Sequence, residues 1–193
     1  FSYDGKRYQL NDVVITPGYV QEGGPPLWIA TMSEAGAERV ARHDAHILPQ
    51  GLRARAFDPW VEALHESGRS PDHYRKGIIR SVLVTDDLDR DWRPVRTAER
   101  YRMQLYRRFF EESNEGFGED GEPIPQTWIV GDVSDCVDQL EAFVRAFGIT
   151  DLVTMAVPPG LPVDALNHSH EQLFKVVVPQ LKARLNASTI ISG

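Results

Sequence analysis

The residues best suited to hold a ligand lie between positions 31 and 36, where Thr31 and Ser33 carry hydroxyls and Gly36 follows. The apolar run just before them predicts a buried strand, and Ser33 is a typical helix N-cap. A helix that starts where a strand ends offers free N–H groups and the positive end of its dipole to an anion. Ligands bind at this end of the strands in parallel α/β folds. We therefore expect Thr31, Met32, Ser33 and Gly36 to form an anion site; the alternative is a capped helix that binds nothing.

Other reactive residues lack a supporting pattern. The phosphate loop G-x-x-x-x-G-K-[S/T] and the nucleophile elbow G-x-S-x-G are both absent from the sequence. The single cysteine, Cys136, lies in a predicted helix with no motif around it, so we expect a small buried apolar residue rather than a nucleophile. No catalytic residue is assigned on this basis.

Histidines and acidic residues are also expected to be structural or solvated. His168 and His170 are two residues apart, a spacing that puts both on one face of a strand but not of a helix. Because they stand at a predicted helix start, we expect solvated side chains and no metal site. His46 is expected to be a hydrogen-bonded histidine at the rim of the core rather than a pocket residue. The acidic residues between 86 and 91 follow a predicted strand and are expected to form a solvated loop.

Strands and helices alternate along the chain. Apolar and β-branched runs predict strands at 27–30, 46–49, 78–84, 129–131 and 151–157. Helical spacing predicts helices at 33–43, 57–67, 98–112, 132–147 and 167–185. Asp132 and Asp135 are placed as a capping box, and Gly148 as a helix stop. Residues 1–24 predict an irregular segment with at most a brief extended piece, and residues 114–125 a mobile surface loop.

Composition limits the class of protein. The chain has 193 residues, of which 41% are hydrophobic and 25% charged, as expected for one globular domain. The net charge of −7 and the lack of a Lys/Arg run argue against a nucleic-acid partner. One cysteine indicates a reducing compartment, and neither a membrane-length apolar run nor a signal-peptide pattern is present. We therefore expect a cytoplasmic protein.

The alternation of strands and helices predicts a parallel sheet built from βα units. A doubly wound sheet and part of a (β/α)8 barrel both fit this pattern. A whole barrel takes about 250 residues, more than the chain supplies. The residues alone therefore predict either half a barrel or a small open sheet. Strand order separates the two, because a barrel fragment keeps its strands in sequential order without a switch point.

Three segments, in this order, resemble the luciferase-like flavin monooxygenase family. They are residues 25–42 (PPLWIATMSEAGAERVAR), then WIVGD, CVDQL and FGITDLV within 128–153, then residues 178–181 (VPQL). The likeness begins near the fifth strand of the family's barrel, and the first four strands have no counterpart. It therefore implies a single domain, residues 1–193, that is the C-terminal half of a TIM barrel with about four βα units. A chain that begins at Phe1 also fits a fragment.

The resemblance implies a flavin- or deazaflavin-dependent oxidoreductase or monooxygenase that acts on a small organic substrate. FMN or a deazaflavin coenzyme would be the cofactor, with NAD(P)H or a flavin reductase as the source of electrons. In the family, the corner that matches Thr31, Met32, Ser33 and Gly36 helps to hold the cofactor phosphate. The alternative is a non-catalytic flavin-binding relative or structural partner subunit, because the family's paired glycines appear here as Ala30 and Thr31.

A half-barrel has unpaired edges and one uncovered face. We therefore expect the chain to associate, as a homodimer or with the missing half of the barrel. The side chains left exposed would come from strands such as 28–29 and 153–155. We expect neither a membrane nor a nucleic acid as a partner.

Overall fold

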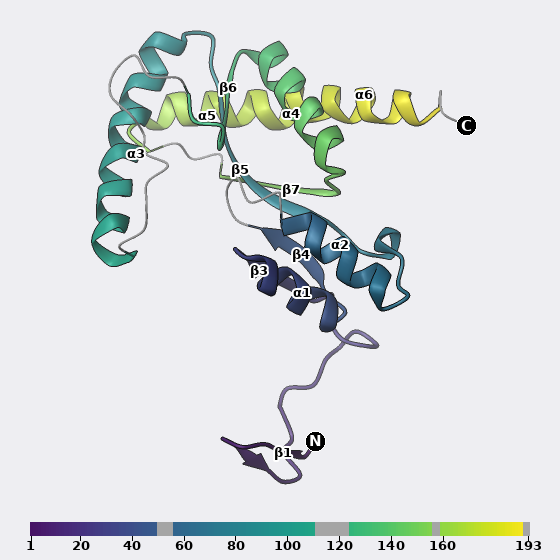
Figure 1. Ribbon diagram of the computed structural model, residues 1–193. Helices are drawn as coiled ribbons and strands as arrows, with labels where there is room; N and C mark the ends of the chain where they lie inside the picture. Colours follow the sequence, from purple (N-terminus) through teal and green to yellow (C-terminus); the bar gives the residue numbers. More distant parts are fainter. Residues whose placement is uncertain (50–55, 111–123, 156–158, 191–193) are drawn as a thin grey trace.

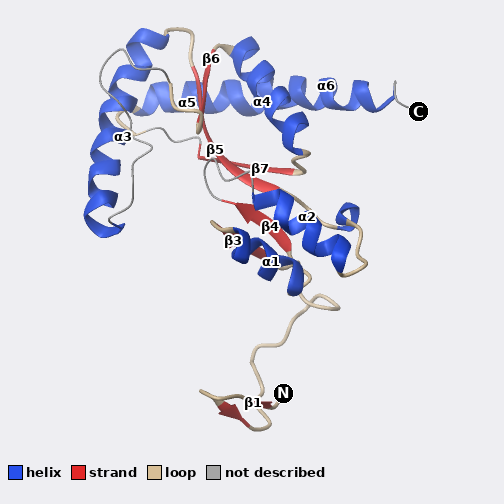
Figure 2. Ribbon diagram, viewed as in Figure 1, coloured by secondary structure: helices blue, strands red, loops and turns tan. Residues whose placement is uncertain are grey.

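The computed structural model describes residues 1–49, 56–110, 124–155 and 159–190 (Figure 1). The strands are β1 (Tyr3–Asp4), β2 (Gln9–Leu10), β3 (Trp28–Thr31), β4 (His46–Pro49), β5 (Gly77–Val84), β6 (Trp128–Gly131) and β7 (Asp151–Met155). The helices are α1 (Glu34–Arg42), α2 (Phe57–Glu66), α3 (Leu88–Phe110), α4 (Val133–Phe147), α5 (Val163–Gln172) and α6 (Val178–Ile190). A 3-10 turn, η2 (Pro71–His73), precedes β5, and a π-helical segment, η3 (Leu173–Val177), joins α5 to α6. The alternation predicted from the sequence is confirmed (Figure 2).

Residues 1–24 form an extended arm. Its only regular structure is the short antiparallel pair β1–β2, in which Tyr3 lies opposite Leu10. Figure 1 shows this pair well away from the other elements. The prediction of an irregular segment with a brief extended piece is confirmed.

β3 and β4 form the first parallel pair, with Trp28 opposite His46. Helices α1 and α2 cover one face of this pair, and Val40, Trp60 and Leu64 are fully buried between them. A single parallel bridge from Ile47 to the residue before β5 continues the sheet. The predicted βα units are therefore present from β3 to β5.

β5 is the central strand of the second part of the sheet, whose order is β6-β5-β7. Its last four residues pair with β6, and its first five pair with β7. The expectation of sequential strand order is therefore wrong at the last step, because β7 lies beside β5 and not beside β6. The physical reason is length: β5 has eight residues and can pair with a different strand at each end.

Both faces of β5 and β6 are covered by helices. Val82, Val84 and Ile129 pack against α4, η3 and α6, whereas Leu83 and Trp128 pack against Trp92 and Val95 of α3. Figure 1 accordingly shows α3 and α4 on opposite sides of these strands. The strands form an open α/β sheet and no closed barrel, and α3 packs on the face of β5 and β6 that a barrel would turn inward.

Local capping follows the sequence closely. Ser33 caps α1, and Asp132 and Asp135 form the predicted capping box at the start of α4. Gly148 ends α4 in the left-handed conformation at φ 60°. These features are set within one or two turns of chain, which is why the sequence predicts them well.

Two helices differ from prediction in extent. α3 begins at Leu88 rather than near residue 98, although Pro94 lies inside it. Burial of Trp92 and Val95 against β6 outweighs the cost of that proline. The last predicted helix is a continuous run from Val163 to Ile190 through the π-helical segment. The predicted loop at 114–125 lies almost wholly outside the described residues, as do residues 156–157 of the last predicted strand.

Candidate functional site

The four residues of the predicted anion site meet at the C-terminal end of β3. Ser33 has an extended backbone and its Oγ accepts a hydrogen bond from the Gly36 N–H at 3.2 Å, which fixes the start of α1. Ser33 and Met32 are exposed, and Gly36 is half-buried. Of the two hydroxyl side chains, Thr31 and Ser33, only Ser33 is therefore exposed to solvent beside the helix terminus.

Thr31 is buried, and its side chain hydrogen-bonds the backbone of the turn instead of facing solvent. Its hydroxyl donates to the Ser33 carbonyl at 3.1 Å, and the same hydroxyl oxygen accepts from the Ser33 N–H at 3.4 Å. A β-carbon at position 36 would overlap the Thr31 hydroxyl. Glycine at position 36 is thus what allows the strand end and the first helical turn to approach each other.

The backbone supplies most of the attraction for an anion at this corner. The first N–H groups of α1, from Glu34 and Ala35, precede the first intrahelical hydrogen bonds and point out of the helix start. Together with the dipole they favour a phosphate or carboxylate. The Glu34 carboxylate is exposed in the same turn and must turn away for such a ligand to bind.

His46 and Cys136 have the structural roles predicted for them. His46 Nδ1 accepts a hydrogen bond from the Arg75 N–H at 3.2 Å, and its ring packs edge-on against Trp28. Cys136 is fully buried, and burial raises the pKa of its thiol to about 12. Neither residue is placed for acid–base or nucleophilic chemistry.

Sequence reasoning missed a buried polar group where β5 meets α3. Thr85 and Asp91 are both buried, and the Thr85 hydroxyl donates to Asp91 Oδ2 at 2.5 Å. Arg90 holds both oxygens of the same carboxylate at 2.7 Å. The expected solvated loop is therefore wrong for Asp91, which lies in the first helical turns of α3. An acidic residue in the first turns of a helix was the available signal, but it does not indicate burial.

The histidine pair lies inside α5, not at its start. His168 Nε2 is 3.5 Å from Asp86 Oδ2, and the ring of His170 lies 6.1 Å from that of Phe174. The buried residue between them, Ser169, accepts a hydrogen bond from the Val84 N–H and so anchors α5 to β5. In the part of the chain that the structure describes, no cluster of three metal-ligating side chains occurs.

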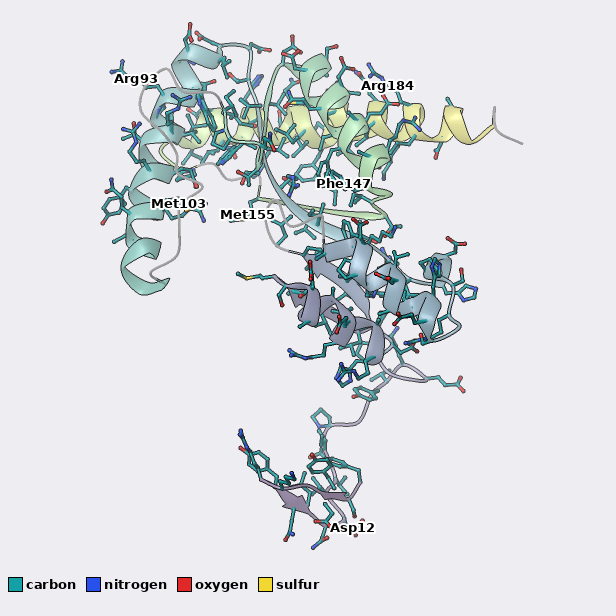
Figure 3. The ribbon with its side chains drawn as sticks, in the orientation of Figure 1. Asp12, Arg93, Met103, Phe147, Met155 and Arg184 are labelled. Carbon is teal, nitrogen blue, oxygen red and sulfur yellow. The ribbon has the colours of Figure 1, made fainter. Side chains whose placement is uncertain are left out.

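An open groove of about 550 Å³ runs along α3. It is lined by Arg93, Pro94, Thr97, Ala98, Tyr101 and Gly160. Gly160 sits here at φ 87°, and a β-carbon there would meet the Pro94 carbonyl. Arg93 projects from the outer side of the helix in Figure 3. The groove does not include the corner at Ser33.

Comparison with known proteins identifies the family. Residues 1–151 match the sequence pattern of the family described as luciferase-like monooxygenase. The chain belongs to the luciferase-like monooxygenase family. The resemblance to this family drawn from the sequence is thus confirmed over residues 1–151. A search of curated proteins found no match.

Solved structures of this family share the fold. Monooxygenase RslO1 from Streptomyces bottropensis superposes with a TM-score of 0.70 at 13% identity, over 93% of this chain and 55% of that one. The oxygenating constituent of 3,6-diketocamphane monooxygenase from Pseudomonas putida, solved in complex with FMN, gives 0.63 at 19% identity, over 93% and 57%. Coenzyme F420-dependent tetrahydromethanopterin reductase from Methanopyrus kandleri gives 0.66 at 17%, over 93% and 58%.

The luciferase-like chain described here spans about half the length of those matched structures. At such low identity the likeness establishes the fold alone. Among the described residues, no helix is long and apolar enough to cross a lipid bilayer.

Proposed function

We propose that this chain is the C-terminal half of a flavin- or deazaflavin-dependent oxidoreductase or monooxygenase, and that it holds the cofactor phosphate at the corner of Thr31, Met32, Ser33 and Gly36. The carrying observation is that α1 starts at the C-terminal end of β3 with the Ser33 hydroxyl exposed beside its first N–H groups. Membership of the luciferase-like family supplies the chemistry, since matched enzymes include one solved with FMN and one that depends on F420.

Each residue of the corner has a separate task in this proposal. The N–H groups of Glu34 and Ala35 and the Ser33 hydroxyl would donate to phosphate oxygens. Thr31 would hold the turn from behind through the Ser33 carbonyl. Gly36 would keep the turn tight. The isoalloxazine or deazaflavin ring supplies the redox chemistry, with a small organic substrate as its target and NAD(P)H or a flavin reductase as electron source.

A non-catalytic flavin-binding relative, or a structural partner subunit, is the second candidate. The Thr31 hydroxyl is buried in the turn, so Ser33 is the one exposed hydroxyl between positions 31 and 36. A single side-chain donor for the cofactor phosphate favours this second candidate. Oxygen uptake or hydride transfer by the assembled protein would exclude it. We place the protein in the cytoplasm, in keeping with one buried thiol.

Titration of FMN, F420 and inorganic phosphate, followed by amide chemical shifts, tests the phosphate site directly. We expect saturable shifts at Glu34, Ala35 and Gly36. A hydrogen bond to a charged oxygen contributes about 1.5–3 kcal/mol, so Ser33→Ala should weaken binding by about tenfold to a hundredfold.

Ser70→Ala is the matched control. Ser70 is also a serine N-cap, accepting from the Asp72 N–H at 3.3 Å, but it precedes β5 and so lies at the opposite end of the strands. Cofactor affinity should be unchanged in this variant. Equal affinity of wild type and Ser33→Ala would place the phosphate elsewhere and remove the proposed site.

A further inference from the structure

The parallel sheet consists of two parts that share few backbone hydrogen bonds. β3 pairs with β4, and β5 pairs with β6 and β7, but within the described residues β4 and β5 meet only at the isolated bridge between Ile47 and Lys76. There the Ile47 N–H donates to the Arg75 carbonyl, and the Arg75 N–H donates to His46 Nδ1, each at 3.2 Å. We call these four residues the sheet joint. Parallel neighbours are usually held by a row of evenly spaced hydrogen bonds, so the joint alone restrains the angle between the two parts weakly.

The apolar core on the helix side also connects the two parts. Ile47 and Trp60 pack there with Ile78 of β5 and with Ile149, which precedes β7. The hydrophobic attraction between such side chains follows the buried area and has no preferred direction. Ion pairs and ring contacts depend more strongly on the angle, and the other face of the sheet carries a set of them that crosses the joint.

The Arg75 side chain reaches across this second face from β3 to β7. Its guanidinium lies 5.4 Å from the centre of the Trp28 ring of β3. The same group forms a two-bond ion pair with Asp151 of β7, in which Nε donates to Oδ2 at 2.8 Å and Nη2 donates to Oδ1. β4 and β5 lie between these strands, which on a flat sheet would be about 14 Å apart at about 4.8 Å for each spacing. One side chain therefore connects two strands that do not pair with each other.

The Trp28 ring is itself held across the joint. It packs edge-on against the His46 ring of β4, with ring centres 4.9 Å apart. A β-carbon at Gly77 would lie 2.8 Å from the indole, so glycine allows the ring to lie over the start of β5. Trp28 thus spans from β3 to β5, and the ion pair of Arg75 with Asp151 extends the connection to β7.

We propose that Arg75 is a positioning residue that sets the angle between the β3–β4 and β5–β7 parts of the sheet by tying Trp28 to Asp151. The corner at Ser33 directly follows β3, so the same contacts set where the corner stands relative to β5 and β7. This role is independent of which ligand the corner binds and of the proposed redox chemistry. Without Arg75 the apolar core still connects the two parts, but their angle varies and the joint opens more often.

Hydrogen exchange at two adjacent amides of β4 tests the proposal in the 193-residue chain. The His46 N–H donates to the Leu27 carbonyl within the β3–β4 pair, whereas the Ile47 N–H donates across the joint. In Arg75→Met, the Ile47 N–H should exchange faster by about tenfold, as expected for loss of an exposed ion pair together with a cation–π contact. Exchange of the His46 N–H should be unchanged. A general loss of stability would accelerate both amides.

Spin labels on α1 and α4 measure the relative position of the two parts. The exposed positions Glu38 and Ala142 are replaced by cysteine in a Cys136→Ala background. The distribution of distances between the labels should broaden in Arg75→Met. Asp151→Asn should give a smaller change in the same direction at both readouts, because the contact with the Trp28 ring remains. Should Arg75→Met not fold, Asp151→Asn decides by the same two measurements.

Arg184→Met is the matched control. The Arg184 guanidinium of α6 also joins two elements, since it pairs with Asp138 and Glu141 of α4, but it lies outside the sheet joint. Both amides and the distance distribution should match wild type in this variant. Circular dichroism checks that all variants remain folded. Unchanged exchange at Ile47 in Arg75→Met, equal acceleration at Ile47 and His46, an unchanged distance distribution, or the same effects in Arg184→Met would each overturn the proposal.

Discussion

The Thr85 hydroxyl donates a hydrogen bond of 2.5 Å to Asp91 Oδ2 and so links the end of β5 to the first turns of α3. Thr85 continues the strand, where its N–H donates to the Gly131 carbonyl. The strand end, its neighbour β6 and the helix that follows are thus joined through one residue pair.

We expect Asp91→Asn to lower the free energy of unfolding by about 1.5–3 kcal/mol at neutral pH, the usual contribution of hydrogen bonds to a charged group. Hydrogen bonding by Arg90 holds the pKa of the Asp91 carboxyl below its usual value against the opposite effect of burial, and Thr85 adds to the lowering. Because the pKa is lower in the folded state, this stabilisation is present above the unfolded pKa of about 3.9 and is lost as the pH falls through the folded pKa.

Urea denaturation of both proteins from neutral to acid pH measures this difference. Asp89→Asn is the control, since Asp89 lies in the same helical turn but is exposed. The two stability curves of wild type and Asp91→Asn should converge at low pH. A constant difference across the range would show that Asp91 does not act through its charge.

Gly36→Ala should destabilise the chain by about 1–3 kcal/mol through overlap with the Thr31 hydroxyl. Combined with Thr31→Ala, which removes the overlapping oxygen, the same change should cost much less. Thermal denaturation of the two single variants and the double variant measures the coupling between them. Strictly additive effects would contradict the close approach of these residues.

Trp92→Ala should cost about 3–5 kcal/mol, as expected for removal of a large buried side chain. Trp92 packs edge-on against Trp128 with ring centres 5.1 Å apart and is part of the contact that places α3 on the inner side of β6. Near-ultraviolet circular dichroism should change with it, because the two indoles interact. Arg93→Ala, on the exposed side of the same turn, should leave stability within about 0.5 kcal/mol of wild type. Equal effects of the two variants would argue against this position of α3.

Cys136 should react with thiol reagents only as fast as the protein unfolds. Burial, more than the nearby carboxylates of Asp135 and Asp132, raises the pKa of its thiol to about 12. A raised pKa stabilises the folded state below the unfolded thiol pKa of about 8.5, and this stabilisation is lost as the pH rises toward the folded value. Cys136→Ala should therefore lose less stability than wild type between neutral and alkaline pH. Rapid labelling of the folded protein would contradict the burial.

The sequence by itself determined the strands, the caps and the family. Apolar runs located β3, β4 and β5, and Ser33, Asp132 and Gly148 located helix ends, because each of these signals acts within a few residues of the chain. That the four residues of the corner lie together was predictable for the same reason, since a strand end and a helix start are neighbours in sequence.

Only the tertiary structure decided the strand order, the side on which α3 packs and the burial of Asp91. β5 is apolar on both faces from Val82 to Val84, so its sequence does not say which helix covers which side or which strand pairs with which end. The buried Asp91 carboxylate accepts a hydrogen bond from the hydroxyl of Thr85, which directly follows β5 and lies six residues earlier, across a turn. These features depend on contacts between residues that are distant in the sequence. The chain adopts the packing that buries the most apolar area while its buried polar groups remain hydrogen-bonded.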